Sequence, residues 1–249
     1  MNKYNSFQIK ILMALLMVLD HIPHIPGLIP STWEGIFHVI TRCVGVWFAY
    51  VAVEGFIYTR SRVKYNVRLF FWAGVMILGN YLLSLQGIIV INNIFLTLAV
   101  GVFMLNILFY DIKCLSKFSS KKLVIIKIIR IILALSIFVL GLSVTEGGIV
   151  IIPFMLLTYL FRKSMKCKVI SYLVFSLLLF FTAYVDYGDI STTINMLMFN
   201  SDFMLFTVIP FILMYNGERG LNNKFSKYFF YVFYPAHLWI IGIIGYFMT

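Results

Sequence analysis

The chain has 249 residues, of which 62% are hydrophobic and 12% are charged, and its formal net charge is +11. Soluble domains average about 45–50% apolar and about 25% charged residues, so this composition excludes a soluble globular enzyme, a disordered chain and a disulfide-stabilised secreted domain. The three cysteines, Cys43, Cys114 and Cys167, are scattered and predict neither a disulfide framework nor a zinc site.

Apolar segments divide the chain into membrane spans. A bilayer core about 30 Å thick needs about 20 apolar residues per helix. This criterion predicts an all-α polytopic membrane protein, a single domain over residues 1–249 with about nine transmembrane helices. Their predicted ranges are 6–23, 33–59, 65–85, 93–111, 121–143, 147–161, 168–185, 192–215 and 228–248. The 192–215 segment is interrupted by Asn195, Asn200, Ser201 and Asp202, which predicts a broken or re-entrant helix.

Lysine and arginine predict the orientation of these helices, because both are enriched in cytoplasmic loops. Of the 20 basic residues, all but Arg42 lie near the N-terminus or in alternate connections, at about 60–68, 111–130, 162–168 and 219–227. The other connections hold no Lys or Arg, and they carry or adjoin Glu34, Glu146, Asp186 and Asp189. We therefore expect the N-terminus inside and the C-terminus outside.

Ionisable residues inside the predicted spans are candidates for function, because each costs about 2.5–3.5 kcal/mol to insert at mid-membrane. Asp20 and His21 lie near the outer end of the first span, and Arg42 lies about 13 Å below the outer start of the second. An Asp20–Arg42 pair could be a purely structural lock, or it could leave His21 free as a general base. Glu54 lies about 18 Å further inside and is too distant to pair directly with Arg42.

The last predicted span contains Tyr234, Pro235 and His237, which places a histidine near the middle of the membrane. Pro235 removes one helical hydrogen bond and frees a carbonyl group, which could open a pocket there. His24 and His38 lie near the outer interface and are expected to be ordinary interfacial residues. No third ligand accompanies the histidines, so no metal site is expected.

Several blocks resemble one family of membrane proteins. Residues 12–22, an apolar helix that ends in Asp20-His21-Ile22, resemble the opening helix of TraX-type proteins. Further blocks that resemble this family follow in order, at 42–60, 65–69, 93–98, 216–220 and 231–238. The chain departs from the family pattern at Gly45-Val46, where Phe-Pro is usual, and at Pro23, where a glycine often follows.

The resemblance implies an acetyltransferase of the bacterial cytoplasmic membrane. It would take acetyl groups from cytoplasmic acetyl-CoA and deliver them to an acceptor outside, in TraX proteins the N-terminal amine of pilin. In this reading His21 is the general base, and Asp20 and Arg42 orient it or balance its charge. His237 and Tyr234 would polarise the thioester carbonyl or donate to its oxyanion.

The basic inner loops would receive the phosphates of coenzyme A. The expected contacts are Arg60, Arg62, Arg68, Lys113, Lys117, Lys121 and Lys122. Glu54 would position the pantetheine arm or form an inner gate. The expected partners are acetyl-CoA, the lipid bilayer and a peptide, pilin-like or glycan acceptor, with no nucleic acid.

Other functions also fit the sequence. One is O-acetylation of an envelope glycan, and another is a transporter in which Asp20, His21 and Arg42 form a proton or substrate site. A third is a membrane chaperone for a peptide partner. The lack of a visible internal repeat disfavours a secondary transporter, because many transporters are built from repeats.

Overall fold

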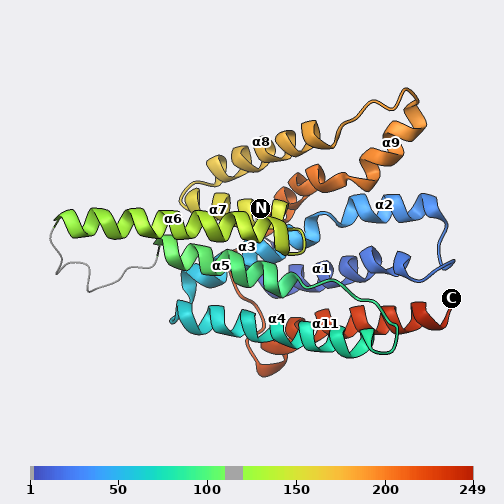
Figure 1. The fold of residues 1–249 in the computed structure, drawn as a ribbon, viewed down its shortest axis with the longest axis horizontal. Coiled ribbons are helices and arrows are strands. Elements are labelled where there is room, and N and C mark those ends of the chain that lie inside the picture. The colour runs from blue at the N-terminus through green and yellow to red at the C-terminus, as the bar shows by residue number, and fades with distance from the viewer. Residues whose placement is uncertain (1–2, 110–119, 249) are drawn as a thin grey trace.

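The computed structural model describes residues 3–109 and 120–248, and within these ranges the chain is helical and forms no strand (Figure 1). The α-helices are α1 (Ser6–His21), α2 (Ser31–Thr41), α3 (Cys43–Tyr58), α4 (Arg62–Ser84), α5 (Ile94–Phe109), α6 (Ser120–Val144), α7 (Gly148–Leu160), α8 (Met165–Ala183), α9 (Ile190–Phe199), α10 (Ile209–Met214) and α11 (Lys224–Phe247). Two 3₁₀ helices, η1 (Ile22–His24) and η3 (Ser201–Val208), lie between them.

The lengths of the helices agree with a protein that crosses a membrane several times. Six helical segments of the described chain are long and apolar enough to span a bilayer, at 6–24, 32–58, 62–84, 121–144, 165–183 and 224–247. The helix α9 and the segment formed by η3 and α10 make a pair bent by 56°, in agreement with the broken or re-entrant helix predicted at 192–215. The polytopic all-α fold is thus confirmed, whereas the count of nine spans and their orientation stay predictions.

The predicted second span remains one membrane segment, but its helix is interrupted for one residue, Arg42, between α2 and α3. The Thr41 hydroxyl donates to the Phe37 carbonyl at 2.7 Å, and Arg42 Nε donates to the His38 carbonyl at 2.9 Å. Side chains that bond to carbonyl groups of the preceding turn compete with the backbone and bend helices. The break therefore follows from the two polar side chains at 41 and 42.

The helix α3 lies in the centre of the bundle, where it contacts α1, α5, α7 and η3. Its residues Val46, Trp47, Val53 and Phe56 are fully buried. In contrast, α6 has many exposed apolar residues, such as Ile125, Ile128, Ile129 and Ile132. A helix that is apolar on its outer side fits a lipid environment.

The helices α4 and α11 cross closely at Gly79. A Cβ atom on Gly79 would lie 2.1 Å from Cζ2 of Trp239, and Trp239 Nε1 donates to Asn80 Oδ1 at 2.9 Å. The indole ring therefore occupies the space that a side chain at position 79 would need. This crossing fixes the part of α11 that carries His237.

The segment before α1 pairs with the loop before α11. The N–H groups of Lys3 and Tyr4 donate to the Met214 carbonyl, and the Ser6 N–H donates to the Glu218 carbonyl at 2.8 Å. In return, the Asn216 N–H donates to the Tyr4 carbonyl at 2.9 Å. We call this paired region, residues 3–7 with 214–219, the terminal clasp.

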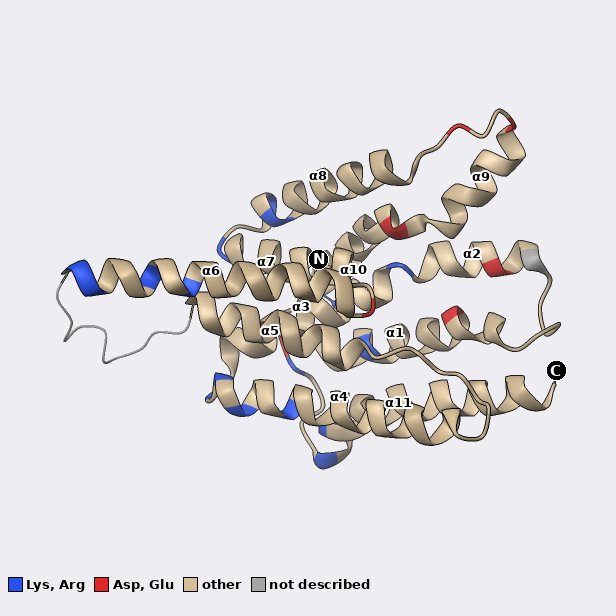
Figure 2. Ribbon diagram, viewed as in Figure 1, with Lys and Arg blue, Asp and Glu red and all other residues tan. Residues whose placement is uncertain are grey.

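Charges are segregated along the long axis of the molecule. Figure 2 shows Lys and Arg gathered at the end where α4, α6 and α8 begin, and Asp and Glu toward the opposite end. We refer to these ends as the basic face and the acidic face.

Candidate functional site

A cavity of about 310 Å³ lies toward the acidic face, between α1, α2, α3, the loop before α7 and α11. We call it the histidine cavity. Its polar lining consists of Asp20, His21, His24, His38, Thr41, Arg42, Asn92, Glu146, Asp202 and Tyr234. The break at Arg42 lies on its wall, so the interruption of the second span places polar side chains at the cavity.

Asp20 and Arg42 form an ion pair, as the sequence suggested. Arg42 Nη2 donates to Asp20 Oδ1 at 3.1 Å, and the single proton of the Thr41 hydroxyl is shared between this oxygen, 2.5 Å away, and the Phe37 carbonyl. Arg42 Nη1 donates to Asp202 at 3.4 Å, so the guanidinium connects α1 with η3. Arg42 Nη2 also lies 3.0 Å from His38 Nδ1. Because arginine has no acceptor, His38 Nδ1 accepts this bond, and His38 belongs to the polar network instead of being a simple interfacial residue.

His21 and His237 lie together in the interior, and both are buried. His21 Nδ1 is 2.7 Å from the Met17 carbonyl, and His237 Nδ1 is 2.9 Å from the Phe233 carbonyl. A carbonyl oxygen only accepts, so both Nδ1 atoms carry the proton, and both Nε2 atoms present a lone pair in the neutral rings. His237 Nε2 lies 3.4 Å from His21 Nδ1, which makes the two rings a coupled pair.

His21 Nε2 is the free nitrogen of this pair. Within the described chain it has no hydrogen-bond partner, and no hydrogen bond or ion pair joins His21 to Asp20. The ring of His24 is 5.4 Å away, between centroids, in an edge-to-face arrangement. A neutral imidazole with a free lone pair at a polar cavity is suited to accept a proton.

Tyr234 is held by two hydrogen bonds at the inner end of the histidine cavity. Its hydroxyl accepts from the Ile94 N–H at 3.0 Å and donates to Glu146 Oε2 at 3.0 Å. Glu146 also accepts from the Asn93 N–H at 2.5 Å and from Asn92 Nδ2 at 2.7 Å. The hydroxyl proton of Tyr234 is therefore committed to a carboxylate, so the structure makes Tyr234 part of a scaffold in place of a free donor to an oxyanion.

A second cavity, of about 500 Å³, lies toward the basic face. We call it the basic cavity, because its lining includes Lys10, Arg68, Arg219 and Lys227 but a single acid, Glu54. The two cavities share four lining residues: Met17, Phe48, Ile94 and Tyr234. They therefore meet inside the bundle, and together they extend from the basic side toward the acidic side.

Among the residues expected to contact coenzyme A, the structure brings Arg68 and Glu54 to the basic cavity. Arg68 Nε is buried and has no hydrogen-bond partner in the described chain. Arg60 is exposed and does not line the cavity. Arg62 is used in packing, because it donates to the Phe109 carbonyl at 3.1 Å and its guanidinium lies 4.5 Å from the Phe56 ring centroid.

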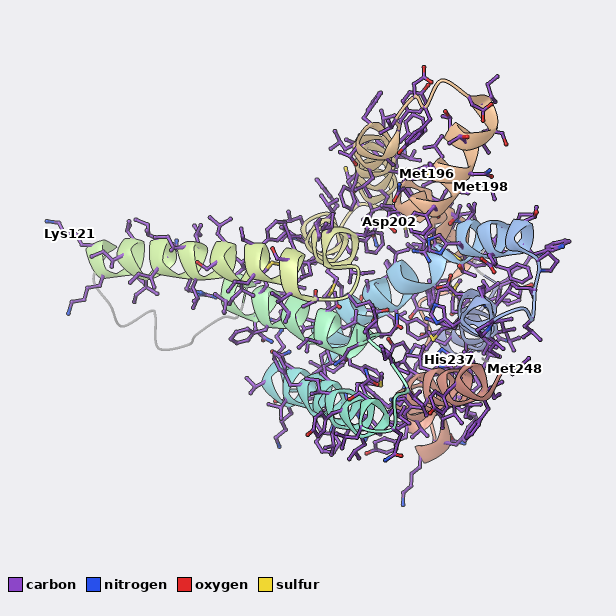
Figure 3. All side chains as sticks on the ribbon, turned by 45° about the vertical axis from the view of Figure 1, so that its right-hand side comes forward. Lys121, Met196, Met198, Asp202, His237 and Met248 are labelled. Atoms are coloured by element: carbon purple, nitrogen blue, oxygen red, sulfur yellow. The ribbon has the colours of Figure 1, made fainter. Side chains whose placement is uncertain are left out.

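The lysines of α6 also lie away from the basic cavity. Lys121 and Lys122 are exposed at the first turn of α6, and Figure 3 shows Lys121 at the free end of that helix, far from His237 and Asp202. Lys113 and Lys117 lie outside the described residues. The physical reason is geometric, because the first turns of α6 extend beyond the ends of the neighbouring helices (Figure 1).

Five charged residues of the cavities have no predicted role at the site. In the sequence analysis Lys10, Arg219 and Lys227 are topology signals, Glu146 is a loop acid and Asp202 interrupts a span. Two signals could have marked them: Lys10 interrupts an apolar helix, and Arg219 belongs to a block that resembles the family.

The comparisons with known proteins agree with the resemblance noted in the sequence. The family model described as TraX protein matches residues 6–245. Neither the curated proteins nor the solved structures contain a match to the chain.

Proposed function

Because the chain belongs to the TraX family, we propose that it is a membrane acetyltransferase. It takes an acetyl group from acetyl-CoA bound in the basic cavity and transfers it to an acceptor amine in the histidine cavity. One observation carries this proposal. A cavity lined by four Lys and Arg residues adjoins a cavity lined by histidines and acids, and the two share Met17, Phe48, Ile94 and Tyr234.

The proposed topology has the basic face in the cytoplasm of a bacterial cell. The six long segments, the bent pair and the two shorter apolar helices, α5 and α7, then make nine crossings. An odd number of crossings puts the two termini on opposite sides, so with the basic face inside we propose an N-terminus in the cytoplasm and a C-terminus outside. The basic cavity thereby opens to the compartment that contains acetyl-CoA, in line with the positive-inside rule.

Four cations and one buried unpaired nitrogen support binding of the coenzyme A phosphates in the basic cavity. Lys10, Arg68, Arg219 and Lys227 line this cavity, and Arg68 Nε has an unused donor. Arginine and lysine bind phosphate by charge-assisted hydrogen bonds. The apolar part of the lining, which includes Phe95 and Phe230, suits the pantetheine arm.

The reaction needs one base near the junction of the cavities. The acceptor amine attacks the thioester carbonyl, and His21 Nε2 takes the proton that the nitrogen loses as the C–N bond forms. The C–S bond then breaks, and the proton passes to the thiolate, so the products are the acetylated amine and coenzyme A. His237 Nε2 faces the Nδ1–H group of His21 and stabilises the imidazolium that forms during transfer.

The acids of the histidine cavity favour an amine as the acceptor. Asp20, Asp202 and Glu146 line this cavity with Arg42 as the only Lys or Arg in its described lining. An excess of carboxylates attracts an ammonium group more than a neutral sugar. We therefore propose the N-terminal amine of a peptide or pilin-like protein, with the hydroxyl of an envelope glycan as the second candidate.

A transfer assay in proteoliposomes tests the proposal. Acetyl-CoA with a radioactive acetyl group is supplied at the basic face, and three acceptors are compared: a peptide with a free N-terminus, the same peptide with a blocked N-terminus and an oligosaccharide. We expect label on the free peptide alone, and a loss of about 10²-fold or more in His21→Ala.

Stabilisation by acetyl-CoA separates loss of catalysis from loss of folding. A ligand that binds the folded state raises the unfolding temperature by mass action. His21→Ala should keep the rise that acetyl-CoA produces in the parent protein. Unchanged transfer in His21→Ala would remove His21 as the base, and proton or solute flux without binding of acetyl-CoA would support the transporter instead.

A further inference from the structure

Tyr234 lies at the boundary between the two cavities and is the one polar side chain that lines both in the described chain. The other shared residues, Met17, Phe48 and Ile94, are apolar. The Tyr234 side chain is buried, with 5% of its surface exposed. The ring of Tyr234 therefore lies where the two cavities adjoin.

The hydroxyl of Tyr234 is fixed from two directions. A phenol has one donor, and here it donates to Glu146 Oε2 while accepting from the Ile94 N–H, both at 3.0 Å. The Ile94 N–H belongs to the start of α5, which is a fixed element. The Glu146 carboxylate is the partner that lies on a different segment, in the connection between α6 and α7.

Glu146 is in turn held by groups from the segment before α5. The Asn93 N–H and Asn92 Nδ2 donate to its two carboxylate oxygens, and the Thr97 hydroxyl donates to its backbone carbonyl at 2.7 Å. The carboxylate thus has three donors, one from α11 and two from the segment before α5. This arrangement orients one carboxylate oxygen toward the Tyr234 hydroxyl and connects α11 with the connection between α6 and α7.

We propose that Glu146 is a positioning residue that holds Tyr234 across the junction, and that this pair sets how easily the two cavities communicate. While Tyr234 donates to Glu146, its ring separates the cavities. When the bond to Glu146 is absent, the Ile94 N–H is the one remaining partner of the hydroxyl, so the ring is held less firmly and the passage widens. The Glu146–Tyr234 pair can control this passage whether or not the protein transfers acetyl groups. The pair can therefore be disproved while the proposed function stands, and the proposed function can be disproved while the pair stands.

Cysteine accessibility tests this inference without acetyl-CoA. In a variant whose cysteines Cys43, Cys114 and Cys167 are replaced by alanine, Ala52→Cys places one thiol on the wall of the basic cavity. A charged, membrane-impermeant methanethiosulfonate reagent is added to the acidic face alone, and the labelling rate is measured. The reagent reaches Cys at position 52 only through the junction.

We expect Glu146→Ala to raise the labelling rate by about tenfold, as loss of one hydrogen bond to a charged group predicts. Tyr234→Phe should raise it at least as much, because the ring stays but loses both hydrogen bonds of the hydroxyl. Glu146→Gln keeps a carbonyl oxygen that can accept from the hydroxyl, so its rate should stay near the parent rate. Glu34→Ala, which removes an exposed carboxylate of α2, is the matched control and should not change the rate.

Two controls make the result decisive. Labelling from the basic face should be equal in all variants, which shows that the cavity and the fold are intact. In the double variant Glu146→Ala/Tyr234→Phe the rate should not exceed that of Tyr234→Phe, because this change alone already breaks the bond that Glu146→Ala removes. An unchanged rate in Glu146→Ala, or a double variant whose increase is the product of the two single increases, would overturn the proposal.

Discussion

The Arg42 side chain joins three helices at the histidine cavity. It bonds to Asp20 of α1, to His38 of α2 and to Asp202 of η3. The side chains of Arg42 and Asp20 are each 20% exposed, whereas that of Asp202 is 55% exposed. The Asp20 bond is therefore expected to contribute more to stability than the Asp202 bond.

Arg42→Ala should lower the free energy of unfolding by about 1–3 kcal/mol, because it leaves the Asp20 carboxylate with one fewer charged partner. Asp202→Asn should cost about 0.5 kcal/mol or less, as for an exposed ion pair. Thermal unfolding in the same detergent measures both. An equal cost for the two substitutions would contradict the unequal contribution of the two acids.

His237→Gln should lower kcat for acetyl transfer by about tenfold or more while the KM for acetyl-CoA stays unchanged. The reason is that His237 lines neither the basic cavity nor the junction and contacts His21 through Nε2. Steady-state kinetics with the free peptide acceptor gives both constants. A rise in KM alone would mean that His237 contributes to binding of the donor and not to the action of His21.

Two glycines of α4, Gly79 and Gly74, differ in how closely a neighbouring helix packs against them. A Cβ atom at Gly79 would clash with the Trp239 ring, whereas a Cβ atom at Gly74 would meet nothing within 4 Å. Both residues lie within the same helix, so the intrinsic helix preference of alanine acts at each. The two positions therefore separate packing from helix propensity.

Gly79→Ala should destabilise the protein by about 1–3 kcal/mol, because the indole ring must move and its bond to Asn80 is strained or lost. Gly74→Ala should be neutral or stabilise by up to about 1 kcal/mol, from helix propensity. Thermal unfolding of both variants in one detergent measures the difference. A destabilisation of equal size at Gly74 would show that the α4–α11 crossing is not the cause.

The sequence predicts most helices but not the details of their breaks. Apolar runs are sufficient to locate the spans, because the bilayer sets a minimum length. The 192–215 break was predicted because polar residues interrupt the run, and the structure bends there by 56°. The break at Arg42 was not predicted, because it depends on hydrogen bonds that Thr41 and Arg42 make to carbonyl groups of the preceding turn.

The Asp20–Arg42 pair could be predicted from the depths of two charges in neighbouring spans. The coupling of His21 with His237 could not, since it requires the packing of α1 against α11. The residues that line the basic cavity could not be predicted either, because the charge of a loop indicates its side of the membrane and not the direction of each side chain. Lys10 and Lys121 both count as inner charges, but of the two only Lys10 lines the cavity.

At the scale of the whole molecule, some inner charges line the basic cavity and others do not, and this difference can test whether acetyl-CoA binds there. Arg219→Ala should weaken acetyl-CoA binding by about tenfold, as loss of one charge-assisted phosphate contact predicts. The double variant Lys121→Ala/Lys122→Ala removes two charges at the free end of α6 and should bind as the parent protein does. Isothermal titration in detergent measures both, and weaker binding in the lysine variant alone would place the phosphates at α6.

The terminal clasp has a consequence for biogenesis. Arg219 and Gly217 of the basic cavity lie on the loop that bonds to residues 3–7, and Lys10 follows this segment on α1. During synthesis α1 enters the membrane long before that loop and α11, which also lines the basic cavity, leave the ribosome, so this side of the cavity is assembled late. Nascent chains that stop before residue 214 should therefore insert several helices but not bind acetyl-CoA. Binding of acetyl-CoA would then indicate that the fold is complete.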